Sequence, residues 1–220
     1  MKEDSKYNTL QFFVTDNIGH LVLNKPPANR MNHLFFNELK NIVNLEIPAV
    51  DIKALIVSAN GRHFSSGADL NEMMLNIADD KSFSKENKYP AFLEENNKTF
   101  LALSRLKIPV VAALKGICIG SAFELALFCH IRICAENTYM GLPESGFNLM
   151  PGCGGIYKLA EITGKAKAIE LILTGKNISA TEAKDLNIIH KIVSRNELLF
   201  EAGMIALRLA ERNEFMDILQ

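Results

Sequence analysis

The sequence has little of three features that would direct it to a nucleic acid, a membrane or a metal ion. Its 220 residues hold 24 Lys and Arg against 25 Asp and Glu, for a net charge of −1. This balance gives no general attraction to nucleic acid or to an anionic membrane, so neither is expected as a partner. No apolar run approaches the roughly 20 residues that span a bilayer. The first ten residues are polar and carry acids, unlike a secretory signal or transit peptide, which indicates a cytoplasmic protein.

Cysteine is also scarce and irregularly placed. Cys118, Cys129, Cys134 and Cys153 include no C-x-x-C pair, and no histidine spacing suggests zinc. Three of the four lie in strongly apolar stretches, where a free cysteine is usually a reduced core residue. The sequence therefore predicts no metal site and a reducing compartment.

Apolar residues, by contrast, are plentiful and periodic. They make up 48% of the chain, and 220 residues suffice for one domain, 1–220, with a sizeable core. Strands are predicted over 9–14, 20–24, 53–59, 109–114, 131–135 and 189–193. Helices are predicted over 31–45, 69–77, 91–106, 120–129, 156–163, 166–173, 180–186 and 195–212. This alternation indicates an α/β fold, with its core at about 10–193, a short helical part at 195–220 and a polar surface loop at 78–90.

Three segments place small residues directly before a helix. They are HFSSGADL at 63–70, GICIGSAFELALFCH at 116–130 and GLPESGFNLMPGCGG at 141–155. Backbone N–H groups at such a start have no partner within the helix and can point at a ligand. Taken singly, each turn is more often a tight packing corner, and a glutamate after a proline, such as Glu144, is more often solvated.

Glu124 is the one carboxylate in the otherwise small or apolar segment 116–130. Its spacing from Ser121 fits a capping box, in which the glutamate turns back onto the N–H of Ser121. Alternatively, Glu124 is an acid or base in a desolvated pocket. The two interpretations are largely exclusive if a ligand needs the N–H of Ser121.

Read together, the three segments and LILTGKNISATEAKDLNIIHKIV at 171–193 resemble the crotonase, or enoyl-CoA hydratase/isomerase, superfamily. The resemblance covers roughly 10–212 and implies a crotonase-like spiral of ββα repeats with peripheral helices. It also implies a homotrimer or hexamer, an expectation that the short C-terminal helical part weakens.

The resemblance assigns roles to five residues. The N–H groups of Ala68 and Ser121 would form an oxyanion hole, and Gly152 would help to hold an attacking water through its backbone. Glu124 and Glu144, separated by 144 − 124 = 20 residues as in the hydratases, would be the catalytic carboxyl groups. Ser121 stands where the family usually has glycine, so a side chain would crowd the hole.

A CoA thioester would enter this site as the substrate, and no separate cofactor or metal is implied. The candidates for binding CoA are Ser66, Ala68, Asp69, Leu70, Lys25 and Arg30. The backbone of Ser66 and Ala68 would lie near the adenine. Lys25 and Arg30 would contact phosphates, although either could be an ordinary surface cation. His130, where the family usually has aspartate, is expected to have a structural role.

The activity that follows is addition of water to a 2-enoyl thioester. Two N–H donors would stabilise the charge that develops on the thioester oxygen, each by roughly 2.7–4 kcal/mol. Glu124 would activate the water and Glu144 would protonate C2. Four alternatives remain: an enoyl-CoA isomerase that needs only Glu144, an enzyme acting on carrier-protein-bound acyl groups, a non-catalytic binding protein, and an inactive subunit.

Overall fold

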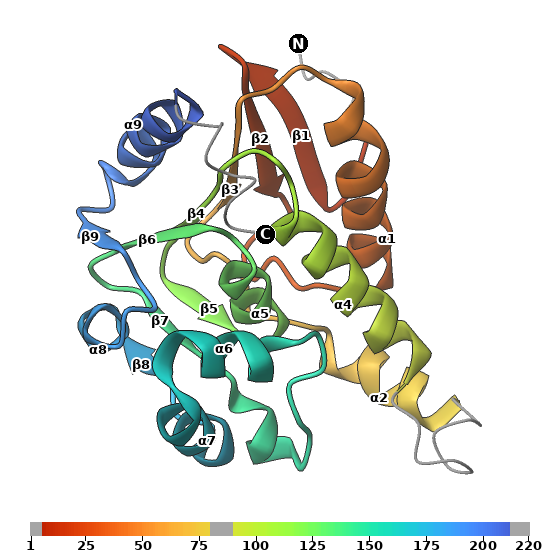
Figure 1. The fold of residues 1–220 in the computed structure, drawn as a ribbon. Helices are drawn as coiled ribbons and strands as arrows, with labels where there is room; N and C mark the ends of the chain where they lie inside the picture. The colour runs from red at the N-terminus through yellow and green to blue at the C-terminus, as the bar shows by residue number, and fades with distance from the viewer. Residues whose placement is uncertain (1–5, 80–89, 212–220) are drawn as a thin grey trace.

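The computed structural model describes residues 6–79 and 90–211, and its centre is a six-stranded sheet (Figure 1). The strand order is β1-β2-β3-β4-β6-β9. The bounds are β1 (Leu10–Thr15), β2 (Ile18–Leu23), β3 (Ala54–Ala59), β4 (Val110–Leu114), β6 (Ile131–Ala135) and β9 (Lys191–Val193). β1 and β2 are antiparallel, and every later pair is parallel. The predicted α/β class and the six predicted strands are confirmed.

A second sheet of three short strands was not predicted. It consists of β5 (Ile117–Ile119), β7 (Tyr139–Gly141) and β8 (Ile178–Ser179), with β5 parallel to β7 and β7 antiparallel to β8. Strands of two or three residues are too short to show a period-2 pattern, so tertiary pairing alone defines them. Strand β5 of this small sheet is followed, after Gly120, by the helix that holds Glu124.

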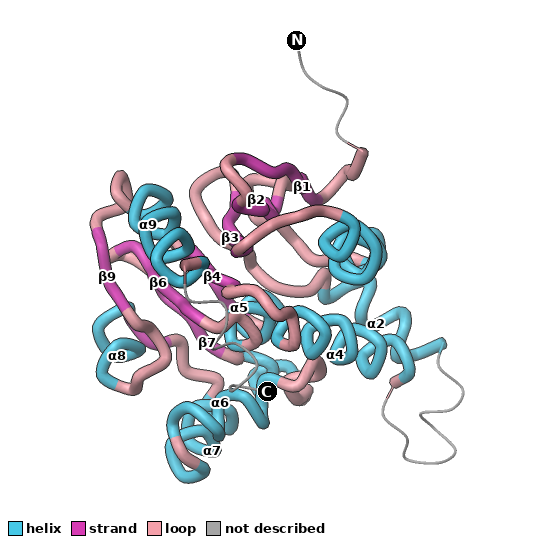
Figure 2. Tube along the Cα trace, turned by 45° about the horizontal axis from the view of Figure 1, so that its top comes forward, coloured by secondary structure: helices cyan, strands magenta, loops and turns pink. Residues whose placement is uncertain are grey.

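Helices surround both sheets (Figure 2). Their bounds are α1 (His33–Asn41), α2 (Leu70–Asp79), α4 (Ala91–Ser104), α5 (Ser121–Leu127), α6 (Gly155–Thr163), α7 (Lys165–Thr174), α8 (Ala180–Asp185) and α9 (Leu198–Ala210). A π-helical turn, Ile42–Glu46, extends α1, and a 3-10 turn, η3 (Pro143–Phe147), precedes α6. Among the described residues, α9 is the helix that covers one face of the main sheet, through Leu198, Ala202 and Ala206.

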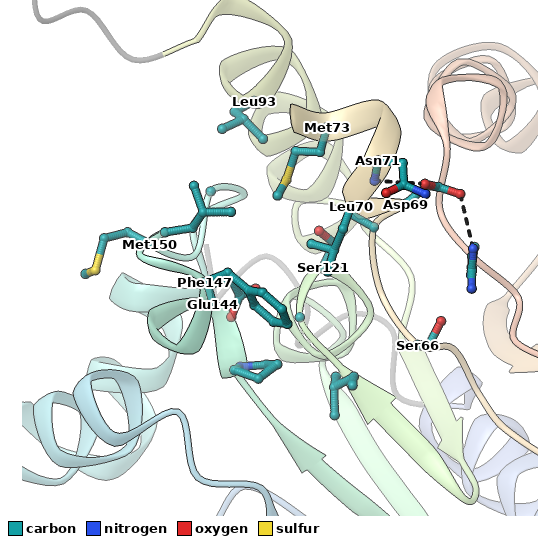
Figure 3. A pocket seen from close by; sticks show the side chains of 17 residues that line it. Ser66, Asp69, Leu70, Asn71, Met73, Leu93, Ser121, Glu144, Phe147 and Met150 are labelled. Carbon is teal, nitrogen blue, oxygen red and sulfur yellow. Dashed lines mark hydrogen bonds and ion pairs between the residues drawn. The ribbon is translucent and has the colours of Figure 1, made fainter. Parts of the chain in front are cut away.

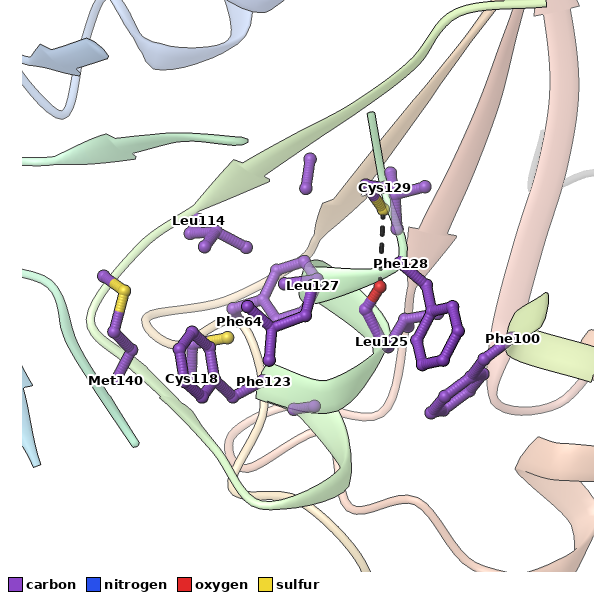
Figure 4. Packing of buried hydrophobic residues seen from close by; sticks show 14 of the residues in the cluster. Phe64, Phe100, Leu114, Cys118, Phe123, Leu125, Leu127, Phe128, Cys129 and Met140 are labelled. Carbon is purple, nitrogen blue, oxygen red and sulfur yellow. Dashed lines mark hydrogen bonds between the residues drawn. The ribbon is translucent and has the colours of Figure 1, made fainter. Parts of the chain in front are cut away.

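The other face of the main sheet holds the larger core. Leu55 and Val57 of β3 face this core, and Ile56 between them faces α9, because side chains alternate along a strand. Figure 4 shows the part of the core around α5, where Phe123 packs near Phe64. A helix that is buried on all sides, as α5 is, holds its side chains in fixed positions.

Local signals explain where several elements begin. Asp16 and Asn17 adopt positive φ values of 50° and 60°, which is the backbone twist of a tight two-residue hairpin turn. Asn32 caps α1 by accepting a hydrogen bond from the Phe35 N–H at 3.0 Å. Of the predicted loop 78–90, residues 78 and 79 belong to α2, which continues past its expected end, and 80–89 lie outside the described residues. In the described ranges, no helix is long and apolar enough to cross a membrane.

Candidate active site

A cavity of about 400 Å³ opens between α2, α5 and η3 (Figure 3). The lining residues are Arg30, Ser66, Ala68, Asp69, Leu70, Asn71, Met73, Leu93, Ile119, Gly120, Ser121, Pro143, Glu144, Phe147, Leu149, Met150 and Gly152. Leu93, Met73 and Met150 lie at one side and Ser66 and Asp69 at the other, with Ser121 and Glu144 between them. The size is that of a small-molecule site, with an apolar end and a polar end.

Two glycine turns meet at the centre of this cavity. Ser65 pairs with Cys118, and the Ile119 N–H donates to the Ser65 carbonyl at 3.3 Å. Gly67 has φ +83°, and a Cβ there would lie 2.6 Å from the Ile119 carbonyl oxygen. Both the conformation and the close approach therefore require glycine at Gly67.

Ala68 and Ser121 each follow a glycine of positive φ, since Gly120 has φ +58°. Both residues line the cavity. Within the described part of the chain, neither N–H donates a hydrogen bond to another residue. Two free N–H groups on adjacent turns are the arrangement that an oxyanion hole requires.

A clamp beneath the Gly67 turn was missed by sequence reasoning. The buried Asn29 donates from Nδ2 to the carbonyls of Asn60, His63 and Phe64 at 2.9, 3.1 and 3.0 Å. The Ser65 hydroxyl donates to the Asn29 carbonyl at 2.7 Å and accepts from the Gly67 N–H at 3.0 Å. These bonds fix the turn that presents Ala68. Asn29 has a positive φ of 47°, which marks it as an unusual loop residue. This backbone angle is known only from the structure, so the sequence carries no signal for the clamp.

Glu144 lies on η3 and lines the cavity. Its Oε2 atom is buried without a hydrogen-bond partner among the described residues, and its Oε1 approaches Gly120 closely enough to lie 3.2 Å from a Cβ placed there. Burial, and then the charge of Glu124, raises the pKa of Glu144 to about 8. The Glu144 carboxyl group is therefore largely protonated at neutral pH and can act as an acid.

Glu124 is fully buried on α5. Its Oε1 accepts hydrogen bonds from the N–H groups of Cys153 at 2.8 Å and Gly155 at 2.9 Å. Its Oε2 is buried without a partner among the described residues. Burial raises the pKa of Glu124, while the N–H groups of Gly155, Cys153 and Gly152 act in the opposite direction. The capping-box interpretation is wrong, because α5 has no side-chain cap and the carboxylate points to the 151–155 loop instead.

The structure separates the two carboxyl groups by their access to the cavity. Glu144 lines it, whereas Glu124 lies behind the wall formed in part by Gly152 and is not among the lining residues. The charge of Glu124 nevertheless reaches Glu144, since it raises the pKa of Glu144. The Cys153 and Gly155 donors that orient Glu124 were not predicted, although the glycine cluster around them was noticed.

Most of the CoA-binding candidates lie together. Ser66, Ala68, Asp69, Leu70 and Arg30 line the cavity. Arg30 pairs with Asp69 at 3.6 Å, and Asp69 also caps α2 by accepting from the Asn71 N–H at 3.1 Å. Lys25 does not line this cavity. It lines a neighbouring one of about 340 Å³, which shares Arg30 and Asp69 with the first.

His130 has the structural contacts expected of it. Its Nδ1 accepts from the Val110 N–H, and its Nε2 faces the Ser104 carbonyl, each at 2.9 Å. These contacts tie the segment after α5 to the end of α4 and the start of β4. Burial lowers the pKa of His130, in keeping with a neutral ring that accepts at one nitrogen and donates at the other.

The fold and the site together define a class of protein: an α/β chain in which Ala68, Ser121 and the carboxyl group of Glu144 line one cavity, with a second buried carboxyl group, that of Glu124, behind its wall. Residues 14–217 match the family model for enoyl-CoA hydratase/isomerase. The chain belongs to this family, and hence to the crotonase superfamily whose resemblance the sequence carries.

Individual relatives agree with this placement. A probable enoyl-CoA hydratase from Bacillus subtilis is 31% identical over 209 residues, which cover 94% of this chain and 78% of the relative. A peroxisomal Δ(3,5)-Δ(2,4)-dienoyl-CoA isomerase from Arabidopsis thaliana is 30% identical over 201 residues, covering 87% of this chain and 72% of that protein. The structure of a putative enoyl-CoA hydratase from Thermobifida fusca in complex with CoA is similar with a TM-score of 0.84 at 27% identity, covering 96% of this chain and 84% of that one.

Proposed function

We propose that the protein is an enoyl-CoA hydratase that adds water to a 2-enoyl-CoA thioester. The observation that carries the proposal is the second buried carboxyl group, Glu124, whose Oε2 has no partner among the described residues. A purely structural glutamate would have both oxygens satisfied, since an unmade buried hydrogen bond costs about 1–3 kcal/mol. An unsatisfied oxygen beside Gly152 is suited to holding a water.

The two carboxyl groups divide the work by their protonation. Burial raises the pKa of Glu124, and the backbone N–H groups of Gly155, Cys153 and Gly152 oppose this rise. The pKa of Glu144 is raised to about 8 by burial and by the charge of Glu124. The N–H groups of Cys153 and Gly155 donate to Glu124 and favour its ionised form, which suits it to the role of the base. Glu124 therefore serves as the base toward water, and Glu144 serves as the acid.

The reaction then balances without a further group. Glu124 takes a proton from water as the water oxygen bonds to C3 of the enoyl group. The electrons move to the thioester oxygen, where the N–H groups of Ala68 and Ser121 stabilise the enolate. Glu144 gives its proton to C2, and transfer of the proton from Glu124 to Glu144 restores the pair. The product is a 3-hydroxyacyl thioester.

The cavity's two ends suit the two parts of such a substrate. The apolar end, with Met73, Leu93 and Met150, would take the acyl chain. The polar end, with Ser66 and Arg30, would take CoA, and Lys25 in the neighbouring cavity would reach a phosphate. The CoA-bound relative supports CoA rather than a carrier protein as the thioester. We also propose the homotrimer that the family resemblance implies, which analytical ultracentrifugation tests.

An isomerase is the second candidate, and one observation favours it. Glu144 lines the cavity but Glu124 does not, so Glu144 alone could shuttle a proton between two carbons of the substrate. Similarity to a dienoyl-CoA isomerase supports the same reading. In that case Glu124 would only hold the 151–155 loop in place.

The test follows loss of the conjugated enoyl-thioester absorbance of crotonyl-CoA. The wild type should hydrate the substrate, and Glu124→Gln and Glu144→Gln should each lose at least about 10²-fold in kcat. Glu161→Gln, an exposed glutamate of α6, is the matched control and should keep full activity. A wild type that is inert to crotonyl-CoA but shifts a 3-enoyl-CoA substrate, with only Glu144→Gln impaired, would establish the isomerase instead.

A further inference from the structure

A small second cavity lies on the face of the main sheet that α9 covers, away from the catalytic carboxyl groups. It has a volume of about 130 Å³. The lining residues are Ser58, Ala59, Ala113, Lys115, Arg195, Asn196, Leu198 and Leu199. Not one of them lines the cavity that holds Glu144. The proposed hydration reaction therefore leaves this cavity without a role.

The fold places the cavity at the carboxyl ends of two parallel strands. Ser58 of β3 and Ala113 of β4 lie on the same face of the sheet as Ile56 and Val111, which pack against α9. Lys115 follows β4 on the same alternation. Leu198 and Leu199, in the first turn of α9, lie on the cavity wall. The carboxyl ends of parallel strands are where open α/β sheets usually bind ligands.

Two cations face this cavity without a carboxylate to balance them. Within the described residues, neither Lys115 nor Arg195 forms an ion pair with an acid, and Arg195 Nη2 donates only to the Gly61 carbonyl at 3.3 Å. Burial and the charge of Arg195 lower the pKa of Lys115. The nearby Glu197 accepts from the Ser194 hydroxyl at 2.7 Å and is not a lining residue. Positive charge therefore accumulates around the cavity.

Two further kinds of hydrogen-bond donor lie at this cavity, a serine hydroxyl and backbone N–H groups. Ser58 is only 6% exposed, and its hydroxyl has no hydrogen-bond partner among the described residues. Glu197 precedes α9 without providing a side-chain cap, so no side chain accepts from the first N–H groups of this 13-residue helix. A buried hydroxyl normally has a partner, and an uncapped helix start favours negative charge.

We propose that this cavity binds one phosphate-sized oxyanion, held by Lys115, Arg195, the Ser58 hydroxyl and the first N–H groups of α9. The volume is well below the roughly 300–1,000 Å³ of sites that enclose whole small molecules. The ligand is therefore a free phosphate or the terminal phosphate of a larger ester whose remainder lies in solvent. The site stands independently of the hydratase proposal.

The test is an NMR titration of the full chain with inorganic phosphate, at constant ionic strength set with sodium chloride. The amide of Leu199 should shift in a saturable way. Lys115→Gln and Arg195→Gln should each weaken phosphate binding at least about tenfold, the loss of one charge-assisted hydrogen bond. Lys165→Gln is the matched control, because Lys165 begins α7, another helix without a side-chain cap. It should leave the affinity unchanged.

The proposal is overturned if phosphate gives no saturable shift at Leu199, or if Lys165→Gln weakens binding as much as the cavity variants do. Arg195 is exposed, so Arg195→Gln should fold and decides the matter if Lys115→Gln does not. A titration with CoA and with dephospho-CoA identifies the source of the anion. If inorganic phosphate and CoA both shift Leu199 and dephospho-CoA does not, the anion is the terminal phosphate of an ester. A response to inorganic phosphate but to neither form of CoA assigns the free anion.

Discussion

Replacing Glu144 with glutamine should stabilise the fold, and the gain should grow as the pH rises. The pKa of Glu144 is raised from 4.5 to about 8 by burial and by the charge of Glu124. Between these two pH values the folded chain keeps a proton that the unfolded chain has released. Stability therefore falls as the pH rises through this window, and the penalty is complete above about pH 8. Glutamine resembles the protonated acid and carries no such penalty.

The size of the effect follows from the width of the window. At pH 7 the interval is 7 − 4.5 = 2.5 pH units, and at 1.36 kcal/mol per unit it is worth at most about 3.4 kcal/mol. Glu144 lines a cavity that admits solvent, which reduces the gain, so we expect at least about 1 kcal/mol at pH 7. For a chain of this size, 1 kcal/mol corresponds to roughly 2–4 °C in Tm.

The assay is urea unfolding of the wild type and Glu144→Gln at pH 5, 6, 7 and 8. The two free energies of unfolding should nearly coincide at pH 5 and diverge steadily toward pH 8. Glu161→Gln, whose carboxylate is exposed and paired with Lys158, should follow the wild type at every pH. Parallel curves for wild type and Glu144→Gln would refute the raised pKa, and with it the assignment of Glu144 as the acid.

Two glycine substitutions probe the backbone that builds the site, and one histidine substitution probes the stability of the fold. Gly67→Ala places a methyl carbon 2.6 Å from the Ile119 carbonyl at φ +83°, so kcat should fall at least about 10²-fold. Gly146→Ala, with nothing within 4 Å of its Cβ, should keep wild-type kinetics with crotonyl-CoA. His130→Leu leaves the Val110 N–H without its partner and should lower the free energy of unfolding by about 1–3 kcal/mol at unchanged KM, as calorimetry and steady-state kinetics would show.

The main sheet was predictable because each long strand carries its own apolar pattern. The segment 54–59 is buried at every residue, as a central parallel strand must be. The three short strands of the second sheet have no such pattern, and their pairing joins segments distant in the sequence, such as Tyr139 with Ser179. Contacts of this kind are decided by the packed fold and not by local preference.

The candidate site was predictable only as a set of motifs. The resemblance brought Ala68, Ser121 and Glu144 into one proposal, and the structure places all three on one cavity. The resemblance gave no indication of the Asn29 clamp, because an asparagine in a loop can form many different local hydrogen bonds. It also did not indicate that Glu124 lies behind the cavity wall, which depends on where the 151–155 loop folds.

The four-residue pattern S-x-x-E gives different results at Ser121 and at Ser179. Ser179 and Glu182 form a true capping box, because Ser179 has the extended backbone of an N-cap and its hydroxyl accepts from the Glu182 N–H at 3.2 Å. Ser121 instead lies inside its helix, and Gly120, at φ +58°, occupies the N-cap position. That one-residue displacement turns the Glu124 carboxylate away from the Ser121 N–H. The glycine thus frees a donor for the cavity and a carboxylate for the 151–155 loop, and both parts of the proposed site depend on it.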